Sequence, residues 1–72
     1  MEKKLVLLKK LGDRIRKLRM RKGLSQTELA NIVGKDQQSI QRLEAGKINP
    51  SFYYLCEIAD GLEINIMTLL KL

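Results

Sequence analysis

The sequence is poor in the residues on which most enzymes, metal sites and disulfide-bonded proteins depend. Its 72 residues contain no histidine and no tryptophan, and only one cysteine and one proline. Without histidine, the commonest general base and metal ligand are missing. The single cysteine, Cys56, can neither form a disulfide within the chain nor join a Cys/His cluster that holds zinc. We therefore expect a protein that is not an enzyme and that uses no metal or other cofactor.

Long apolar runs are also missing, although the chain is apolar enough to build a core. No run approaches the roughly 18 residues of a membrane span. The basic start of the chain lacks the long apolar segment and the cleavage site of a signal peptide. The hydrophobic content of 44% is nevertheless too high for a disordered tail. We expect a single domain over residues 1–72, located in the reducing cytoplasm.

Positive charge is concentrated at the start of the chain, within a net charge of +6. Residues 1–24 carry ten Lys/Arg against two acidic residues, residues 25–47 are balanced, and residues 48–72 carry one against three. Such a basic block suits nucleic acid or an anionic membrane surface, but it also suits a solvated helix face. Charge alone leaves these alternatives open.

Apolar residues recur at helical spacing, and strand-like alternation is weak. A first helix ending near Gly23 is predicted by the stripe Leu8, Leu11, Ile15 and Leu18. Residues 1–10 extend this helix at its N-terminal end. Within them, the apolar segment 5–8 either buries a second helix face or meets a partner chain.

Capping residues mark the later helices. Ser25 and Glu28 form a capping box that begins a second helix, which ends at Gly34. Asp36 is a suitable N-cap for a third helix, which ends at Gly46. Only two residues separate these helices, which predicts a tight turn between them.

Two more helices complete a compact all-α domain of five helices. Asn49 or Ser51 caps the fourth helix, and Asn65 caps a short fifth helix from Ile66 to about Leu70. We expect Tyr53 and Tyr54 to be half exposed and Cys56 to lie in or beside the core. The apolar stripe predicted for the fourth helix consists of Phe52, Leu55, Ile58, Ala59 and Leu62.

The third helix has a polar face that the core does not explain. At about 100° per residue, Gln37, Gln38, Gln41 and Arg42 fall within one arc of about 140°. The opposite side is covered by Ile40 and Leu43. Glutamine can pair bidentately with adenine, and arginine with guanine, in the major groove. An ordinary solvated face of a helical bundle is the alternative interpretation.

A resemblance favours the first interpretation. Residues 26–45, QTELANIVGKDQQSIQRLEA, resemble the helix-turn-helix of the lambdoid phage repressor and Cro family of bacterial transcription regulators. Ala30 is small where the two helices approach, Gly34 lies in the turn, and Ile40 and Leu43 anchor the recognition helix. The similarity extends over about residues 11–70. It implies a cytoplasmic transcriptional repressor that binds a palindromic operator in duplex DNA as a homodimer.

The resemblance also implies roles for individual residues. It places base reading on Gln37, Gln38, Gln41 and Arg42. Contacts with the DNA backbone are implied for Gln26, Thr27, Lys35, Ser39, Lys47 and Asn49. An ion pair between Arg19 and Glu44 is implied as a tie between the first and third helices, with a Glu44–Lys47 pair as the alternative. Two positions depart from the family: Ala45 replaces a frequent asparagine, and Glu63 replaces a frequent helix-ending glycine.

Two other functions remain as alternatives. One is an antitoxin or another interaction module whose main partner is a protein, such as a toxin or polymerase, with segment 5–8 and the tyrosines as its contact surface. The other is a membrane-surface role for residues 2–22, which carry basic and apolar faces.

Overall fold

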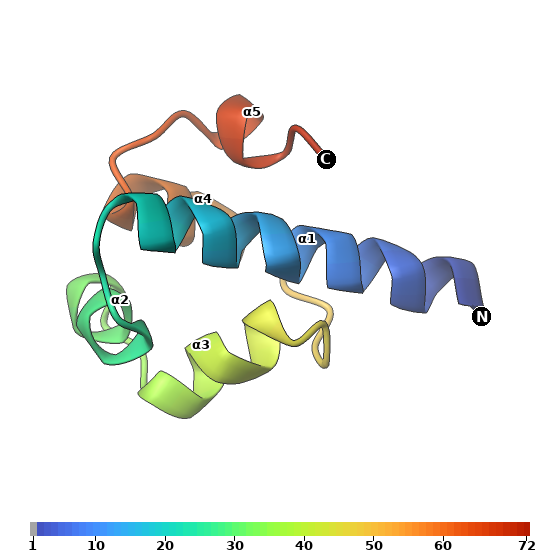
Figure 1. Cartoon of the computed structure of the whole chain (residues 1–72), viewed down its shortest axis with the longest axis horizontal. Helices are drawn as coiled ribbons and strands as arrows, with labels where there is room; N and C mark the ends of the chain where they lie inside the picture. The colour runs from blue at the N-terminus through green and yellow to red at the C-terminus, as the bar shows by residue number, and fades with distance from the viewer. Residues whose placement is uncertain (1) are drawn as a thin grey trace.

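The computed structural model describes residues 2–72, and over these residues the chain forms five α-helices and no strand. The helices are α1 (Glu2–Arg21), α2 (Gln26–Val33), α3 (Gln37–Glu44), α4 (Phe52–Gly61) and α5 (Ile66–Leu69). In Figure 1, α3 and α5 lie on opposite sides of the long helix α1, and α4 lies behind α1. The predicted all-α architecture of five helices is confirmed for the described residues.

One apolar core joins all five helices. The predicted stripe of α1 is confirmed: Leu11, Ile15 and Leu18 are buried, while Leu8 is half-buried at the edge. The largest fully buried side chains are those of Ile15, Leu29, Ile40, Leu43, Ile58, Leu62 and Leu69. At about 1.5–3 kcal/mol for each large apolar side chain, this burial is the main favourable contribution to folding.

The helix ends follow the capping residues. Ser25 forms the predicted capping box with Glu28, and Gly34 ends α2 with a left-handed backbone at φ 71°. Asp36 accepts a hydrogen bond from the Ser39 amide and thereby caps α3. Ser51, rather than Asn49, caps α4. The first amides of these helices are therefore satisfied by side chains close in sequence.

Two glycines allow close approaches between helices. A Cβ atom on Gly12 of α1 would collide with the main-chain carbonyl groups of Leu43 and Glu44 at the end of α3. A Cβ atom on Gly61 of α4 would likewise collide with the side chain of Val33 in α2. Gly61 therefore has a packing role, in addition to weakening the last turn of α4 as its helix propensity indicates.

The prediction that Phe52 packs in the core is wrong. Its side chain is 64% exposed, and its neighbour Tyr53 is 74% exposed. Packing of α4 begins two residues after Phe52, with half-buried Tyr54 and buried Leu55. The first turn of α4 lies at the edge of the domain, so helical spacing alone places Phe52 too deeply.

For the apolar segment 5–8, the first of the two alternatives, burial of a second helix face within the chain, is wrong. The helix does begin at Glu2, but Leu5, Val6 and Leu7 remain 52–53% exposed. They therefore bury no second face within this chain. Met1, the first residue of the predicted extension 1–10, lies outside the described residues.

The turn after α4 uses a non-glycine residue in a left-handed conformation. Glu63 has φ 58°, and the amide of Ile64 donates to the carbonyl of Ala59 across the turn. This is the conformation that a helix-ending glycine would adopt more easily. None of the helices described in residues 2–72 is both long and apolar enough to cross a lipid bilayer.

Candidate nucleic-acid interface

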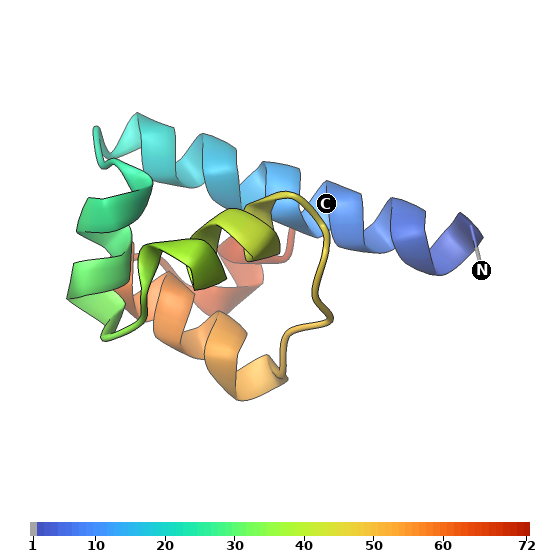
Figure 2. The same ribbon diagram turned by 90° about the horizontal axis from the view of Figure 1, so that it is seen from below.

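The polar face of α3 is exposed at the surface of the domain. Gln38, Gln41 and Arg42 are exposed, whereas Ile40 and Leu43 on the other side are buried. With Ala45 and Lys47, the three exposed side chains line a shallow open groove. Figure 2 shows α3 in front of the domain, between α1 and α4, with nothing covering its outer side. The helix can therefore present this face to a large partner without rearrangement of the fold.

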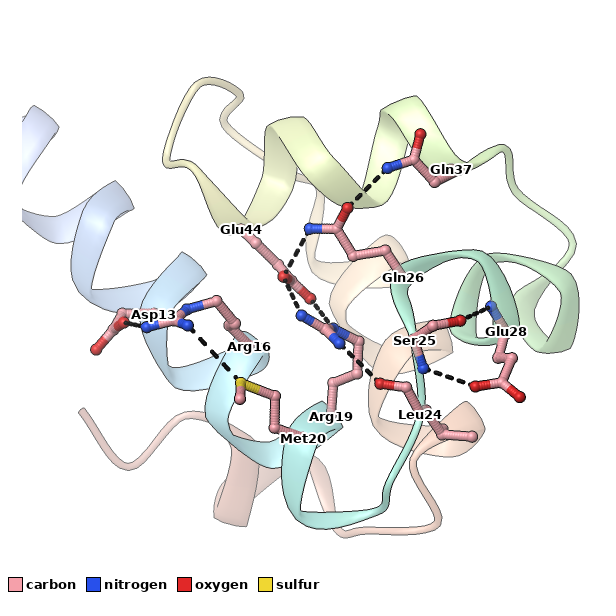
Figure 3. A network of polar contacts seen from close by, with 10 residues as sticks. All are labelled: Asp13, Arg16, Arg19, Met20, Leu24, Ser25, Gln26, Glu28, Gln37 and Glu44. Atoms are coloured by element: carbon pink, nitrogen blue, oxygen red, sulfur yellow. Dashed lines mark hydrogen bonds and ion pairs between the residues drawn. The ribbon is translucent and has the colours of Figure 1, made fainter.

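Gln37, at the start of the same face, is half-buried and is held by a neighbouring helix. Its side-chain Nε2 donates a hydrogen bond of 2.7 Å to Oε1 of Gln26, the first residue of α2 (Figure 3). A glutamine amide has two N–H donors and one carbonyl acceptor. Gln37 therefore keeps one donor and its carbonyl for an external partner. Its orientation, however, is set by Gln26.

Gln26 is in turn held by a buried ion pair. Its Nε2 donates to Oε1 of Glu44 over 3.0 Å, and Glu44 accepts two further hydrogen bonds from Arg19 (Figure 3). The Arg19 Nε–Glu44 Oε2 distance is 2.7 Å, and the Nη2–Oε1 distance is 3.0 Å. Arg19 also donates to the carbonyl of Leu24 over 2.7 Å. Glu44 thus pairs with Arg19 of α1, as predicted, and not with Lys47.

The direction of this hydrogen-bond chain follows from the charge of Glu44. An ionised carboxylate only accepts hydrogen bonds, so Gln26 turns its amide nitrogen toward Glu44. The carbonyl of Gln26 then faces Gln37 and accepts from it. A bidentate Arg–carboxylate pair is among the stronger and more directional polar contacts in proteins. The ion pair therefore fixes the orientation of Gln26, and Gln26 fixes that of Gln37, the first residue of α3.

Besides Gln26, two more of the predicted backbone-contact residues have partners within the chain. The hydroxyl oxygens of Ser39 and Tyr54 lie 2.6 Å apart, within hydrogen-bonding distance. The ammonium nitrogen of Lys35 lies 3.4 Å from Oε1 of Glu57 and 5.3 Å from the centre of the Tyr54 ring. These contacts tie the helix-turn-helix to α4. Sequence reasoning missed Tyr54 and Glu57 because no local pattern links them to residues 35–39.

The other predicted backbone-contact residues are open to solvent. Thr27 lies exposed in the first turn of α2, beside half-buried Gln26, and Lys47 and Asn49 are exposed in the segment after α3. They flank the exposed face of α3 at two of its borders. Lys47 lines the same groove as Gln38, Gln41 and Arg42, whereas Asn49 lines a second groove with the start of α1.

Comparison with known proteins agrees with this geometry. A family model described as helix-turn-helix, HTH_3, matches residues 15–69. The HTH-type transcriptional regulator y4dJ of Sinorhizobium fredii is 37% identical over 57 residues, which cover 79% of this chain and 74% of that protein. A regulator of the same type from Archaeoglobus fulgidus is 46% identical over 49 residues, which cover 68% and 70%.

A solved structure shows the same fold at similar identity. The crystal structure of the restriction-modification controller protein C.AhdI from Aeromonas hydrophila matches with a TM-score of 0.87 and 37% identity. The match covers 90% of this chain and 94% of that chain. The chain therefore belongs to the HTH_3 helix-turn-helix family, whose members are DNA-binding transcriptional regulators and not enzymes.

Proposed function

We propose that the protein is a repressor that binds a palindromic operator as a homodimer, with α3 of each copy in the major groove. The observation that carries this proposal is the exposed, polar and nearly uncharged face of α3, formed by Gln38, Gln41 and Arg42. Occupation of an operator is by itself sufficient to exclude other proteins from that DNA, which is why repression is the simplest outcome.

The side chains of this face suit particular bases. Glutamine can donate to N7 and accept from N6 of adenine, and arginine can donate to N7 and O6 of guanine. Gln37 can contact a base in the same way through its second side-chain N–H and its side-chain carbonyl, because Gln26 and Glu44 fix its orientation. We therefore propose Gln37, Gln38, Gln41 and Arg42 as base-reading residues.

Contacts with phosphates would fix the register of α3 in the groove. Gln26 and Thr27 stand at the start of α2, where the helix dipole also favours an anion. Lys47 and Asn49 stand beyond the other end of α3. We propose Lys35 and Ser39 as further backbone contacts that reach DNA from positions supported by Tyr54 and Glu57.

A dimer follows from the small footprint of one recognition helix. The eight residues of α3 are about 12 Å long at 1.5 Å per residue, so one copy reads only a few base pairs. Two copies related by a two-fold axis place their recognition helices about 34 Å apart, one turn of DNA. The palindromic operator is the DNA counterpart of this symmetry.

The test is a titration on two kinds of duplex. The preferred site is first selected from random duplex DNA, and the parent and the Gln38→Ala and Arg42→Ala variants are then titrated on that site and on a scrambled one. Loss of one bidentate pair should cost about 1–3 kcal/mol on the selected site and little on the scrambled site. Arg21→Ala is the matched control, because Arg21 is an exposed arginine at the end of α1, outside α3.

Several outcomes would contradict the proposal. Equal discrimination between the two duplexes in the parent and in the Gln37→Ala, Gln38→Ala and Arg42→Ala variants would mean that this face does not read bases. If sedimentation of the complex shows one protein copy on each whole operator, the proposed dimer is contradicted. In the first case, a protein as the main partner would become the better explanation of the exposed residues 5–7.

A further inference from the structure

The first part of α1 projects beyond the rest of the domain. Both views show the N-terminal turns of α1 extending past the segment that joins α3 to α4 (Figures 1 and 2). Leu11 is the first buried side chain along the described part of this helix. The residues before it contribute little to the core, so their basic character needs another explanation. The exposed lysines of this projecting part are Lys3, Lys4, Lys9 and Lys10.

These four lysines share one electrostatic feature with Arg21, Arg42, Lys47 and Lys71. None of them belongs to an ion pair among the side chains that the structure describes. The acidic side chains whose positions the structure describes begin with Asp13. Asp13 contacts Lys17 and Arg16, and hydrogen bonds from these two residues lower the pKa of its carboxyl group. The described neighbours therefore leave the positive potential of Lys3, Lys4, Lys9 and Lys10 uncompensated.

The same segment lies against the end of the recognition helix. Gly46, directly after α3, is so close to α1 that a Cβ atom on it would lie 3.0 Å from Cα of Lys9. Lys47 follows Gly46. Farther toward the start of α1, Lys3, Lys4, Leu7 and Leu8 line a groove together with Asn49. Asn49, which is proposed to contact a phosphate, therefore stands beside the start of α1, and Lys47 directly follows the residue that touches Lys9.

Helix geometry separates the lysines into two groups. Gly12 marks the side of α1 that touches α3. At about 100° per residue, Lys9 lies about 60° from Gly12 and Lys4 about 80° from it, on the other flank. Lys10 lies about 160° from Gly12 and Arg21 about 180° from it, so both point away from α3. Of the lysines before Leu11, Lys4 and Lys9 are thus the two that lie within 90° of the side of α1 that touches α3.

We propose that Lys4 and Lys9 form, with Lys47 and Asn49, a phosphate-binding cluster that extends the DNA interface beyond the C-terminal end of α3. This inference rests on the proposed function, because it requires α3 to lie in the major groove. A polyanion fits this surface better than a second copy of the same segment. Two such segments laid side by side would bring eight lysines together, four from each copy.

The experiment compares two double variants that remove the same charge from the same helix. One is Lys4→Gln/Lys9→Gln, and the matched control is Lys10→Gln/Arg21→Gln. Binding of each full chain to the selected duplex is measured over a series of salt concentrations. Each lost phosphate contact reduces the slope of log K against log salt by about 1, so we expect a reduction of about 2 for Lys4→Gln/Lys9→Gln. The control should change the slope by less than half of that amount.

Two further measurements complete the test. Discrimination between selected and scrambled duplexes should be unchanged in Lys4→Gln/Lys9→Gln, because phosphate contacts carry no base information. Lys4→Arg/Lys9→Arg, which keeps the charges, should retain the parent slope. Melting curves of all variants should coincide with that of the parent, since the four substituted side chains are exposed.

The outcomes separate this inference from the proposed function. An unchanged slope in Lys4→Gln/Lys9→Gln, or an equal reduction in the control, would overturn the cluster while the parent still discriminates between duplexes. If the parent binds the selected and scrambled duplexes equally well, the proposed function itself is overturned. Tighter binding of the parent to phosphatidylglycerol vesicles than to duplex DNA, abolished by Lys4→Gln/Lys9→Gln, would identify a membrane contact and also overturn the cluster.

Discussion

The two parts of α1 have similar charge but different surroundings. In residues 11–21 the helix buries Leu11, Ile15 and Leu18 and touches the end of α3 through Gly12. In residues 2–10 the same helix projects from the domain, with Leu5, Val6 and Leu7 about half exposed. A continuous helix therefore contains one part that supplies buried side chains to the core and another in which none of the described side chains is buried.

The basic residues of the two parts differ in kind. Residues 11–21 contain four arginines and one lysine, whereas residues 2–10 contain lysines only. In the packed part, Arg14 donates to the carbonyl of Thr68 over 2.7 Å, and Arg19 binds Glu44. The planar guanidinium group has five donors and suits such partly buried bonds, whereas a lysine side chain is a strongly hydrated point charge. Positive charge in this helix therefore has a structural use in one part and remains available to a partner in the other.

The largest expected effect is the loss of the buried ion pair in the packed part. Arg19→Met would leave the carboxylate of Glu44, whose side chain is 3% exposed, without its cationic partner. Breaking such a pair should lower the free energy of unfolding by about 3–5 kcal/mol. Urea denaturation of the parent and the variant measures the change.

A second variant separates the pair from general disruption of the core. Arg19→Met/Glu44→Leu removes both charges, so it should recover part of the lost stability. If Arg19→Met unfolds at the same urea concentration as the parent, the packed part of α1 is not held by this ion pair.

The next effect concerns the contact between α1 and α3. Alanine in place of a helical glycine ordinarily stabilises by about 0.5–1 kcal/mol. At Gly12, however, the added methyl group would meet main-chain carbonyl groups of α3, and such overpacking costs about 1–3 kcal/mol. Gly12→Ala should therefore lower the free energy of unfolding, measured by urea denaturation. Lys10→Ala, on the exposed side of the same helix, is the control, and stabilisation by Gly12→Ala would disprove the close contact.

The smallest effect is expected in the projecting part. Leu5→Gln/Val6→Gln/Leu7→Gln replaces exposed side chains by a good helix former, so the free energy of unfolding should change by no more than about 0.5 kcal/mol. Leu11→Gln, a matched change at a buried position, should cost several times more. Thermal melting at low and high protein concentration measures both. If the triple variant loses more stability relative to the parent at high protein concentration, residues 5–7 are buried between copies. The projecting part of α1 would then also supply buried side chains.

Local features of the fold were predictable from the sequence. Ser25 and Asp36 cap their helices through hydrogen bonds to amides three residues later, so their effect is contained in a few adjacent residues. The buried stripe of α1 likewise follows from the period of the helix. The Arg19–Glu44 pair, although distant in sequence, was predictable because the resemblance to a known family supplied the relation between the helices.

Other features of the candidate site were not predictable in this way. Helical spacing assigned Phe52 to the core and Gln37 to the freely exposed face of α3. The structure instead exposes Phe52 and joins Gln37 to Gln26. Both outcomes depend on where one helix ends relative to its neighbours, and the period of a single helix does not contain that information.

The helices, most of their caps, the apolar stripe of α1 and the positive charge before residue 25 are predictable from side chains a few positions apart. The pairing of charges, the anchoring of Gln37 and the place of the lysines beside the end of α3 follow only from the folded chain. Those properties depend on distances between helices. Such distances are set by packing contacts, such as that of Gly12 with the last carbonyl groups of α3.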